Sequence, residues 1–140
     1  MNEKRVRTSA GSVAAGALAA KVLEYDRVMT ELAPNVASPA DWEPLSRFIA
    51  VEDFERVGTF MEVQDWDAYT EMLTRWANAI DSFETSVRRI SEVSNLVYDE
   101  VVERHHRGGT VSVVNSLTVF EFDDAGLIRR LAVFLQQPRG

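Results

Sequence analysis

Hydrophobic residues change their spacing a little past the middle of the chain. Before Asp81 they recur every three or four positions, as on the buried face of a helix. After Asp81 they alternate with polar residues over runs rich in Val, Ile, Thr and Phe, as in half-buried strands. Helices followed by consecutive strands predict an α+β domain, in which an antiparallel sheet packs against the helices.

Three segments of the first half have helical spacing. The first covers residues 10–33 and ends before Pro34. The second begins at SPADWEPLSRFI, where Ser38 is a good N-cap and Pro39 suits the first helical position. The third is QDWDAYTEMLTRWANAI, with Asp65 as its N-cap. Between the last two helices, EDFERVGTF is expected to be extended.

The second half predicts a run of strands joined by short turns. We expect strands over residues 83–92, 95–107, 110–122 and 127–136. The central Gly-Gly of RGGT predicts a tight hairpin, and DDAG predicts a four-residue hairpin loop.

These turns fix the register, and the register decides which side chains share a face. Pairing of Arg107 with Thr110 follows from the first turn, and pairing of Phe122 with Leu127 from the second. The second pairing places Thr118 opposite Leu131. One face then carries Asp99, Val101, Glu103, His105, Val114, Ser116, Thr118, Phe120, Phe122, Leu131, Val133 and Leu135. The other face carries Tyr98, Val102, Arg104, His106, Val113, Leu117, Val119, Ile128, Ala132 and Phe134.

Both faces of this sheet carry many apolar residues. A sheet with one face in water alternates more cleanly. The helices can cover only one face, and no further helix is predicted for the other. A second copy of the chain would cover it, so we expect a homodimer formed through the outer face of the sheet.

Composition limits the classes of function. The 140 residues suit one domain, expected over residues 10–137 after a disordered tail of residues 1–9. The net charge of −7 argues against a nucleic-acid partner, and no stretch is long enough to span a membrane. The sequence has no cysteine and 2 histidines, which makes disulfides and a zinc site unexpected and fits a cytoplasmic location.

The order of segments resembles the nuclear transport factor 2-like superfamily, in its SnoaL-like and ketosteroid-isomerase-like branch. The resemblance rests on FIAVEDFERVG, on DWDAYTEML and on the final hairpin FEFDDAGLIRRLAVFLQQ. It implies a cone-shaped α+β barrel, three helices packed on a curved sheet, and a pocket in the mouth. It also implies a dimer and a small hydrophobic substrate, with carboxylate chemistry that needs no cofactor or metal.

Part of the chain is also similar to the limonene-epoxide-hydrolase type, at LVYDEVVERH. By this resemblance the catalytic Arg and Asp of that type fall on Val101 and Glu103, and its second Asp falls on Val133. The catalytic Asp of the isomerases and cyclases falls near Gly58. Of these three acid positions, this sequence has an acid at Glu103 and none at Val133 or Gly58.

Glu103 is the first candidate for a catalytic group, because an acid in an apolar cavity has a raised pKa and suits general acid–base catalysis. His105 and Arg56 are candidate helpers. The alternatives are a strand-end acid paired with Arg or water, a surface histidine, and an arginine paired with Glu52, Asp53 or Glu55. His106 points to the opposite face from His105, so the two cannot bind one metal ion together.

Further residues are candidates for ligand binding: Asp99, Ser116, Thr118, Trp66, Tyr69 and Val133. The alternative for the two aromatic residues is core packing along the third helix. Asp99 lies deep in the expected register, and a buried acid without a partner is costly. Asp99 is therefore paired or functional, or the register slips there.

The sequence thus favours a protein that binds a small hydrophobic ligand in a pocket. Its reaction would be that of a cofactor-independent isomerase, cyclase, dehydratase or epoxide hydrolase. The alternative is a non-catalytic module of the same fold that binds a ligand or forms a dimer.

Overall fold

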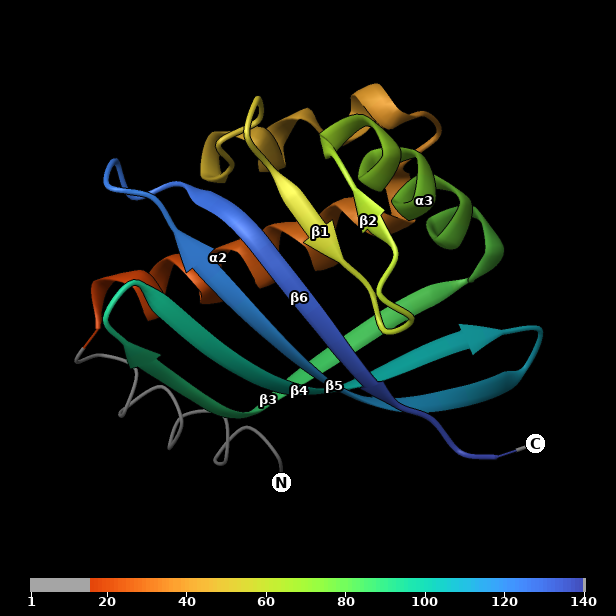
Figure 1. Cartoon of the computed structure of the whole chain (residues 1–140). Coiled ribbons are helices and arrows are strands. Elements are labelled where there is room, and N and C mark those ends of the chain that lie inside the picture. The colour runs from red at the N-terminus through yellow and green to blue at the C-terminus, as the bar shows by residue number, and fades with distance from the viewer. Residues whose placement is uncertain (1–15, 140) are drawn as a thin grey trace.

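The computed structural model describes residues 16–139 and contains helices followed by long strands (Figure 1). The helices are α2 (Ala17–Leu32), η1 (Ala33–Asn35), η2 (Pro39–Phe48) and α3 (Trp66–Ala79). The strands are β1 (Glu55–Val57), β2 (Val63–Gln64), β3 (Ser82–Val93), β4 (Leu96–Arg107), β5 (Thr110–Phe122) and β6 (Ile128–Gln136). The α+β class and the strands of the second half are confirmed. The expected tail and the first residues of the first helix lie outside the described residues.

The sheet is open and mixed, whereas a purely antiparallel sheet was expected. Its strands follow the order β2-β1-β6-β5-β4-β3, and β3 to β6 form an antiparallel meander. The short strand β1 pairs in parallel with β6 at the far edge. A parallel neighbour needs a long connection, and here the connection includes α3 and four strands, β2 to β5. The sheet curves strongly, and α2 crosses behind it in Figure 1.

The Gly-Gly hairpin has the predicted register, with Arg107 opposite Thr110 and Glu103 opposite Val114. Gly108 and Gly109 have φ angles of 55° and 83°, which glycine adopts without strain. The confirmed register carries Asp99 to the inner face, 2% exposed.

The register predicted across the DDAG loop is wrong. Phe122 pairs with Ile128 instead of Leu127, and an irregularity beside this pair shifts the remaining pairs, so that Thr118 lies opposite Val133. The loop is closed by the Asp123 carboxylate, which accepts a hydrogen bond of 2.9 Å from the Leu127 backbone N–H. Ile128 consequently faces the core and is fully buried, although the sequence placed it on the outer face.

The helix caps explain where two helices begin. The Asp65 carboxylate accepts a hydrogen bond from the Ala68 backbone N–H at 2.9 Å, as expected for the N-cap of α3. In the first turn of η2, the Asp41 carboxylate accepts a hydrogen bond of 3.1 Å from the backbone N–H of Ser38, the N-cap residue. The η2 segment is a 3₁₀ helix rather than an α-helix. Pro44 inside it has no N–H to give to an α-helical hydrogen bond.

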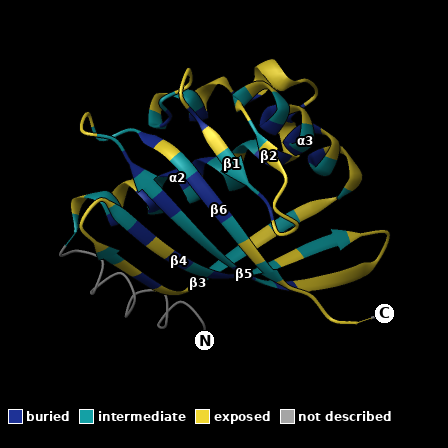
Figure 2. Cartoon of the chain, in the orientation of Figure 1, coloured by how far each residue is buried: buried dark blue, intermediate teal, exposed yellow. Residues whose placement is uncertain are grey.

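The core lies between the helices and the inner face of the sheet (Figure 2). Trp42 and Leu45 of η2 and Val22 of α2 are fully buried in it. The outer face of the sheet carries no helix among residues 16–139, and Val113 and Phe134 are exposed there. One face of the meander therefore holds the core and the site described next, while the other is open.

Candidate functional site

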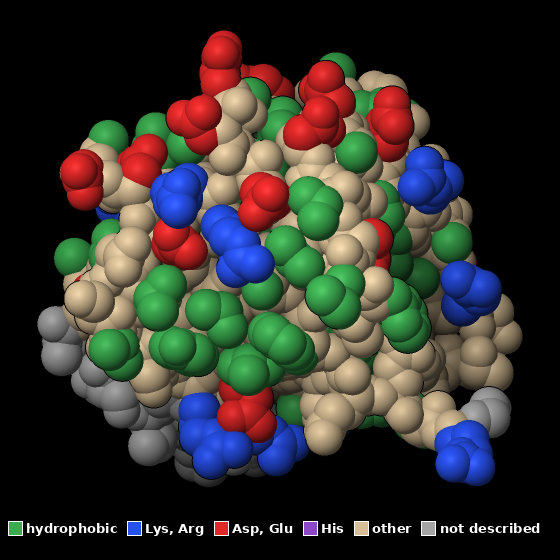
Figure 3. Space-filling view, viewed as in Figure 1, with side chains coloured by type: hydrophobic (Ala, Val, Ile, Leu, Met, Phe, Trp, Pro, Cys, Tyr) green, Lys and Arg blue, Asp and Glu red, His purple; other side chains and the backbone are tan. Residues whose placement is uncertain are grey.

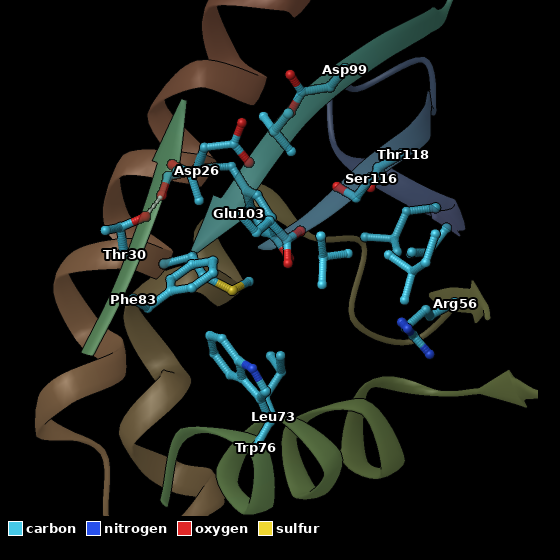
Figure 4. A pocket seen from close by; sticks show the side chains of 18 of the residues that line it. Asp26, Thr30, Arg56, Leu73, Trp76, Phe83, Asp99, Glu103, Ser116 and Thr118 are labelled. Carbon is cyan, nitrogen blue, oxygen red and sulfur yellow. Dashed lines mark hydrogen bonds between the residues drawn. The ribbon is translucent and has the colours of Figure 1, made fainter. Parts of the chain in front are cut away.

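A cavity of about 310 Å³ lies between the inner face of the sheet and helices α2 and α3. Its wall combines apolar side chains such as Leu73 and Val101 with carboxyl, hydroxyl and imidazole groups. Figure 4 shows Asp26 and Glu103 near its middle, Phe83 and Trp76 at one end, and the other labelled groups around them. A volume of this size is at the lower end of the range found for small-molecule sites.

Three side chains form a hydrogen-bonded series along one wall. The indole N–H of Trp76 donates to Nδ1 of His105 at 3.1 Å, and Nε2 of His105 lies 2.9 Å from Oε1 of Glu103. Because Nδ1 accepts from the indole, the neutral ring carries its proton on Nε2 and donates it to the carboxylate. The side chains of His105 and Glu103 are 17% and 21% exposed. The series therefore holds an acid and an imidazole in fixed orientation at the edge of the cavity.

A contact between two acids lies deeper in the cavity. Asp26 comes from α2 and Asp99 from β4, and both line the cavity (Figure 4). Their carboxyl groups lie close enough to influence each other's protonation, and two acids in contact can share one proton. Asp26 keeps some exposure as a residue, but its Oδ2 atom is sealed from water, and so is Oδ1 of Asp99. Neither of these atoms has a hydrogen-bond partner in the described part of the chain.

The environment raises the pKa of both acids. Burial is the largest cause for Asp26, and the neighbouring charges of Asp99 and Glu103 raise its pKa further, well above the ordinary value. Burial also raises the pKa of Asp99, while the hydrogen bond from Asp26 acts in the opposite direction. Two buried carboxyl groups beside each other disfavour the state in which both are charged, so the pair favours a state with one shared proton.

Two tyrosines, Tyr25 and Tyr69, also line the cavity. The hydroxyl groups of Tyr25 and Tyr69 lie 3.0 Å apart, and both side chains are buried. Burial is the first cause that raises the pKa of each hydroxyl, so both stay protonated. They can act as hydrogen-bond donors at neutral pH.

Arg56 reaches the cavity from β1 but does not contact Glu103. Its guanidinium donates to the Gln64 side chain at 2.9 Å and lies 3.6 Å from the Glu62 carboxylate. It also lies 5.6 Å from the centre of the Tyr69 ring. The ion-pair partner is therefore an acid of the β1–β2 hairpin, and not Glu52, Asp53 or Glu55.

The structure brings most of the predicted ligand-binding residues together. Besides Asp99, the cavity is lined by Ser116, Thr118, Tyr69 and Val133. Trp66 is not among its lining residues. It packs in the core against Phe54, with ring centres 5.6 Å apart.

His106 points away from the site, as expected. On the outer face its Nε2 lies 3.0 Å from the Glu84 carboxylate.

Asp26 is the site residue that sequence reasoning missed. It lies four positions after Val22 and three before Met29, so it shares their face of α2. An acid within the apolar stripe of a helix was the available signal. Its partner on β4 is remote in sequence, and only the fold brings the two together.

Among the described residues, no group of three or more His, Cys, Asp or Glu side chains is placed to hold a metal ion. No helix in residues 16–139 is both long enough and apolar enough to cross a membrane.

Comparison with solved structures identifies the fold. A SnoaL-like polyketide cyclase from Shewanella putrefaciens, named as putative, superposes with a TM-score of 0.63 at 11% identity, covering 81% of this chain and 76% of that one. The fold is nuclear transport factor 2-like. That fold also appears in an LEH-like epoxide hydrolase from M. tuberculosis, with a TM-score of 0.57 at 18% identity, covering 77% of this chain and 80% of the other.

A third structure with the nuclear transport factor 2-like fold contains a small molecule. It is a ketosteroid-isomerase-like protein from Catenulispora acidiphila in complex with trimethylamine, with a TM-score of 0.60 at 15% identity, covering 79% of this chain and 84% of that one. No protein-family model matches the sequence, and no curated protein is significantly similar to it. The expected resemblance is therefore confirmed for the fold, and identities this low say nothing about the reaction.

Proposed function

We propose that the chain binds a small hydrophobic molecule in the cavity and moves a proton on it, using its own side chains and no cofactor. The observation that carries this proposal is the series Trp76–His105–Glu103, which orients a carboxylate at the edge of an apolar cavity. General acid–base catalysis needs such a group held within reach of the ligand.

Glu103 would act as the base. It would take a proton from the ligand, and the N–H of His105 would stabilise its carboxylate before the transfer. The protonated member of the Asp26–Asp99 pair would supply a hydrogen bond or a proton elsewhere on the ligand. Because the environments of the two carboxyl sites differ, they can hold different protonation states at the same pH.

The reaction class would be isomerisation, cyclisation, dehydration or epoxide opening, each of which requires a proton to move. Proteins named as a putative polyketide cyclase and an epoxide hydrolase share the fold, which supports this range. Thr118 and Tyr69 would orient the ligand, and Val133 would contact its apolar part.

A panel of small hydrophobic ketones and epoxides tests the proposal. Deuterium exchange next to the carbonyl in D₂O and opening of the epoxide are both followed by NMR. We expect turnover of at least one compound, and a loss of about 10²–10⁴-fold in Glu103→Gln. Glu100→Gln is the matched control, because it removes the same charge from the outward side of the same strand. Unchanged turnover in Glu103→Gln would remove Glu103 from the mechanism.

The alternative is a non-catalytic binding module of the same fold. It is favoured by the residues at the family's other acid positions, which here are Gly58 and Val133. Binding of the panel compounds without any exchange or ring opening would support this alternative over the enzyme.

We further propose that two copies associate through the outer face of the sheet, in the cytoplasm. Tyr98, Val111, Val113 and Phe134 are between 38% and 56% exposed on this face. Figure 3 shows hydrophobic side chains gathered over the strands there. Light scattering should give twice the 15.8 kDa of one chain, and Val113→Glu should give one chain. A wild-type monomer at high concentration would contradict the dimer.

A further inference from the structure

The cavity has two chemically different parts. Around the Asp26–Asp99 pair, its wall carries oxygen atoms that lack partners. Toward the other end, Trp76 and Phe83 meet edge to face with ring centres 4.8 Å apart. A ligand that fills the cavity must therefore satisfy polar atoms at one end and cover aromatic rings at the other.

Ser116 is the clearest sign that a ligand is missing from the polar part. Its side chain is 2% exposed, lines the cavity beside Asp99, and has no hydrogen-bond partner in the described part of the chain. Figure 4 shows it on the strand next to that of Glu103. A buried hydroxyl without a partner is costly, and an N–H or O–H group of a ligand would satisfy it.

The charge of the polar part is also unbalanced. No described basic side chain forms an ion pair with Asp26 or Asp99. The guanidinium of Arg56 is held by Gln64 and Glu62 instead. A buried negative charge without a counter-charge attracts a cation, because little water is present to screen it.

We propose that this end of the cavity binds a protonated amine, which donates its N–H groups to the Asp26–Asp99 pair and to Ser116, while its apolar part packs against Trp76 and Phe83. The inference rests on the ligand cavity of the proposed function, but it does not require turnover. An organic cation fits better than a metal ion, because the described residues offer no cluster of metal ligands. The proposal specifies an N–H bond, because a charged carboxyl group only accepts hydrogen bonds and the Ser116 hydroxyl can accept one as well.

The amine would compete with the proton that the pair shares. Loss of that proton strengthens the attraction, so affinity should increase as the pH rises, as long as the amine stays charged. A neutral carbonyl ligand would behave in the opposite way, because it needs the protonated acid as donor. The titratable or charged groups that face the pair from the surrounding elements are Tyr25, Tyr69, Glu103, His105 and Arg56.

Four benzyl compounds of similar size separate the possibilities: benzylamine, benzyltrimethylammonium, benzyl alcohol and benzoate. Binding to the full chain is followed by the indole N–H signal of Trp76 in two-dimensional NMR, assigned with Trp76→Phe. We expect benzylamine to bind at least about tenfold more tightly than the other three, as a hydrogen bond to a charged group implies. Its affinity should rise between about pH 5 and about pH 8, where an alkyl ammonium stays protonated.

Three substitutions test which side chains bind the amine. Asp99→Asn should weaken benzylamine binding about tenfold and leave the affinity for benzyl alcohol unchanged. Ser116→Ala should weaken it less. Glu100→Gln, which removes a charge on the outer face, should have no effect.

Equal affinity for benzylamine and benzyl alcohol would overturn the proposal, as would tighter binding of benzoate. Affinity that falls with rising pH, or an unchanged Asp99→Asn variant, would overturn it too. These outcomes leave the proton-transfer proposal standing, because that proposal is decided by turnover with neutral compounds. Turnover that depends on Glu103 without amine binding would overturn only the present inference.

Discussion

The shared proton of the Asp26–Asp99 pair predicts an unusual dependence of stability on pH. Burial raises the pKa of both carboxyls in the folded chain above their ordinary value of 3.8. A folded state that holds protons more tightly than the unfolded chain is most stable below that value. It then loses stability as the pH rises toward the folded pKa values. Asp26→Asn removes this loss, because an amide keeps its N–H donor at every pH.

The size of the effect follows from the contacts. In Asp26→Asn the new amide can donate to the Asp99 carboxylate, whose Oδ1 atom has no hydrogen-bond partner among residues 16–139. Wild type must bind a proton at Asp26 on folding, which costs about 1.4 kcal/mol for each pH unit between the ordinary pKa and the raised folded pKa, so we expect the variant to be at least about 2 kcal/mol more stable near pH 8. For a chain of this length, that difference raises Tm by about 6 °C. Near pH 4 the carboxyl of Asp26 is protonated, and the two proteins should be equally stable.

Thermal and urea unfolding, followed by circular dichroism from about pH 4 to about pH 8, measure this difference. Asp124→Asn is the control, because it removes the same charge at an exposed position of the DDAG loop. A variant that is less stable than wild type near pH 8 would refute the shared proton. A difference that does not change with pH would refute it as well.

Three further substitutions test how much a helix cap, a buried side chain and a turn glycine contribute to stability. Asp65→Ala should lower the free energy of unfolding by about 1 kcal/mol, measured by urea unfolding, because it removes the cap at the Ala68 N–H. Ile128→Ala should cost about 2–4 kcal/mol, because this side chain is fully buried, whereas a position on the outer face would lose far less. Gly109→Ala should cost about 1 kcal/mol through its φ of 83° alone, since nothing lies within 4 Å of the new methyl group. If the free energy of unfolding of a variant falls by less than half of the expected amount, the structural reason given for that variant is contradicted.

Much of the backbone could be predicted because its signals are local. The Gly-Gly turn set the register of β4 against β5, and this placed Asp99, Glu103 and Ser116 on one face. The second hairpin was misjudged because the irregularity next to Phe122 depends on how Ile128 packs under the helices. The parallel pairing of β1 was also out of reach, since it depends on a contact between segments far apart in the chain.

By itself, the sequence determined the α+β class, the meander of strands and the face that Glu103 and His105 share. Hydrophobic periodicity and turn residues act over a few neighbouring positions, so both can be read from a single sequence. Only the tertiary structure decided which groups meet across elements. It placed the carboxyl of Asp26 against Asp99, and it turned Arg56 toward Glu62. Burial and nearby charges set the protonation of such groups. Both depend on residues that are close in space but far apart in the sequence.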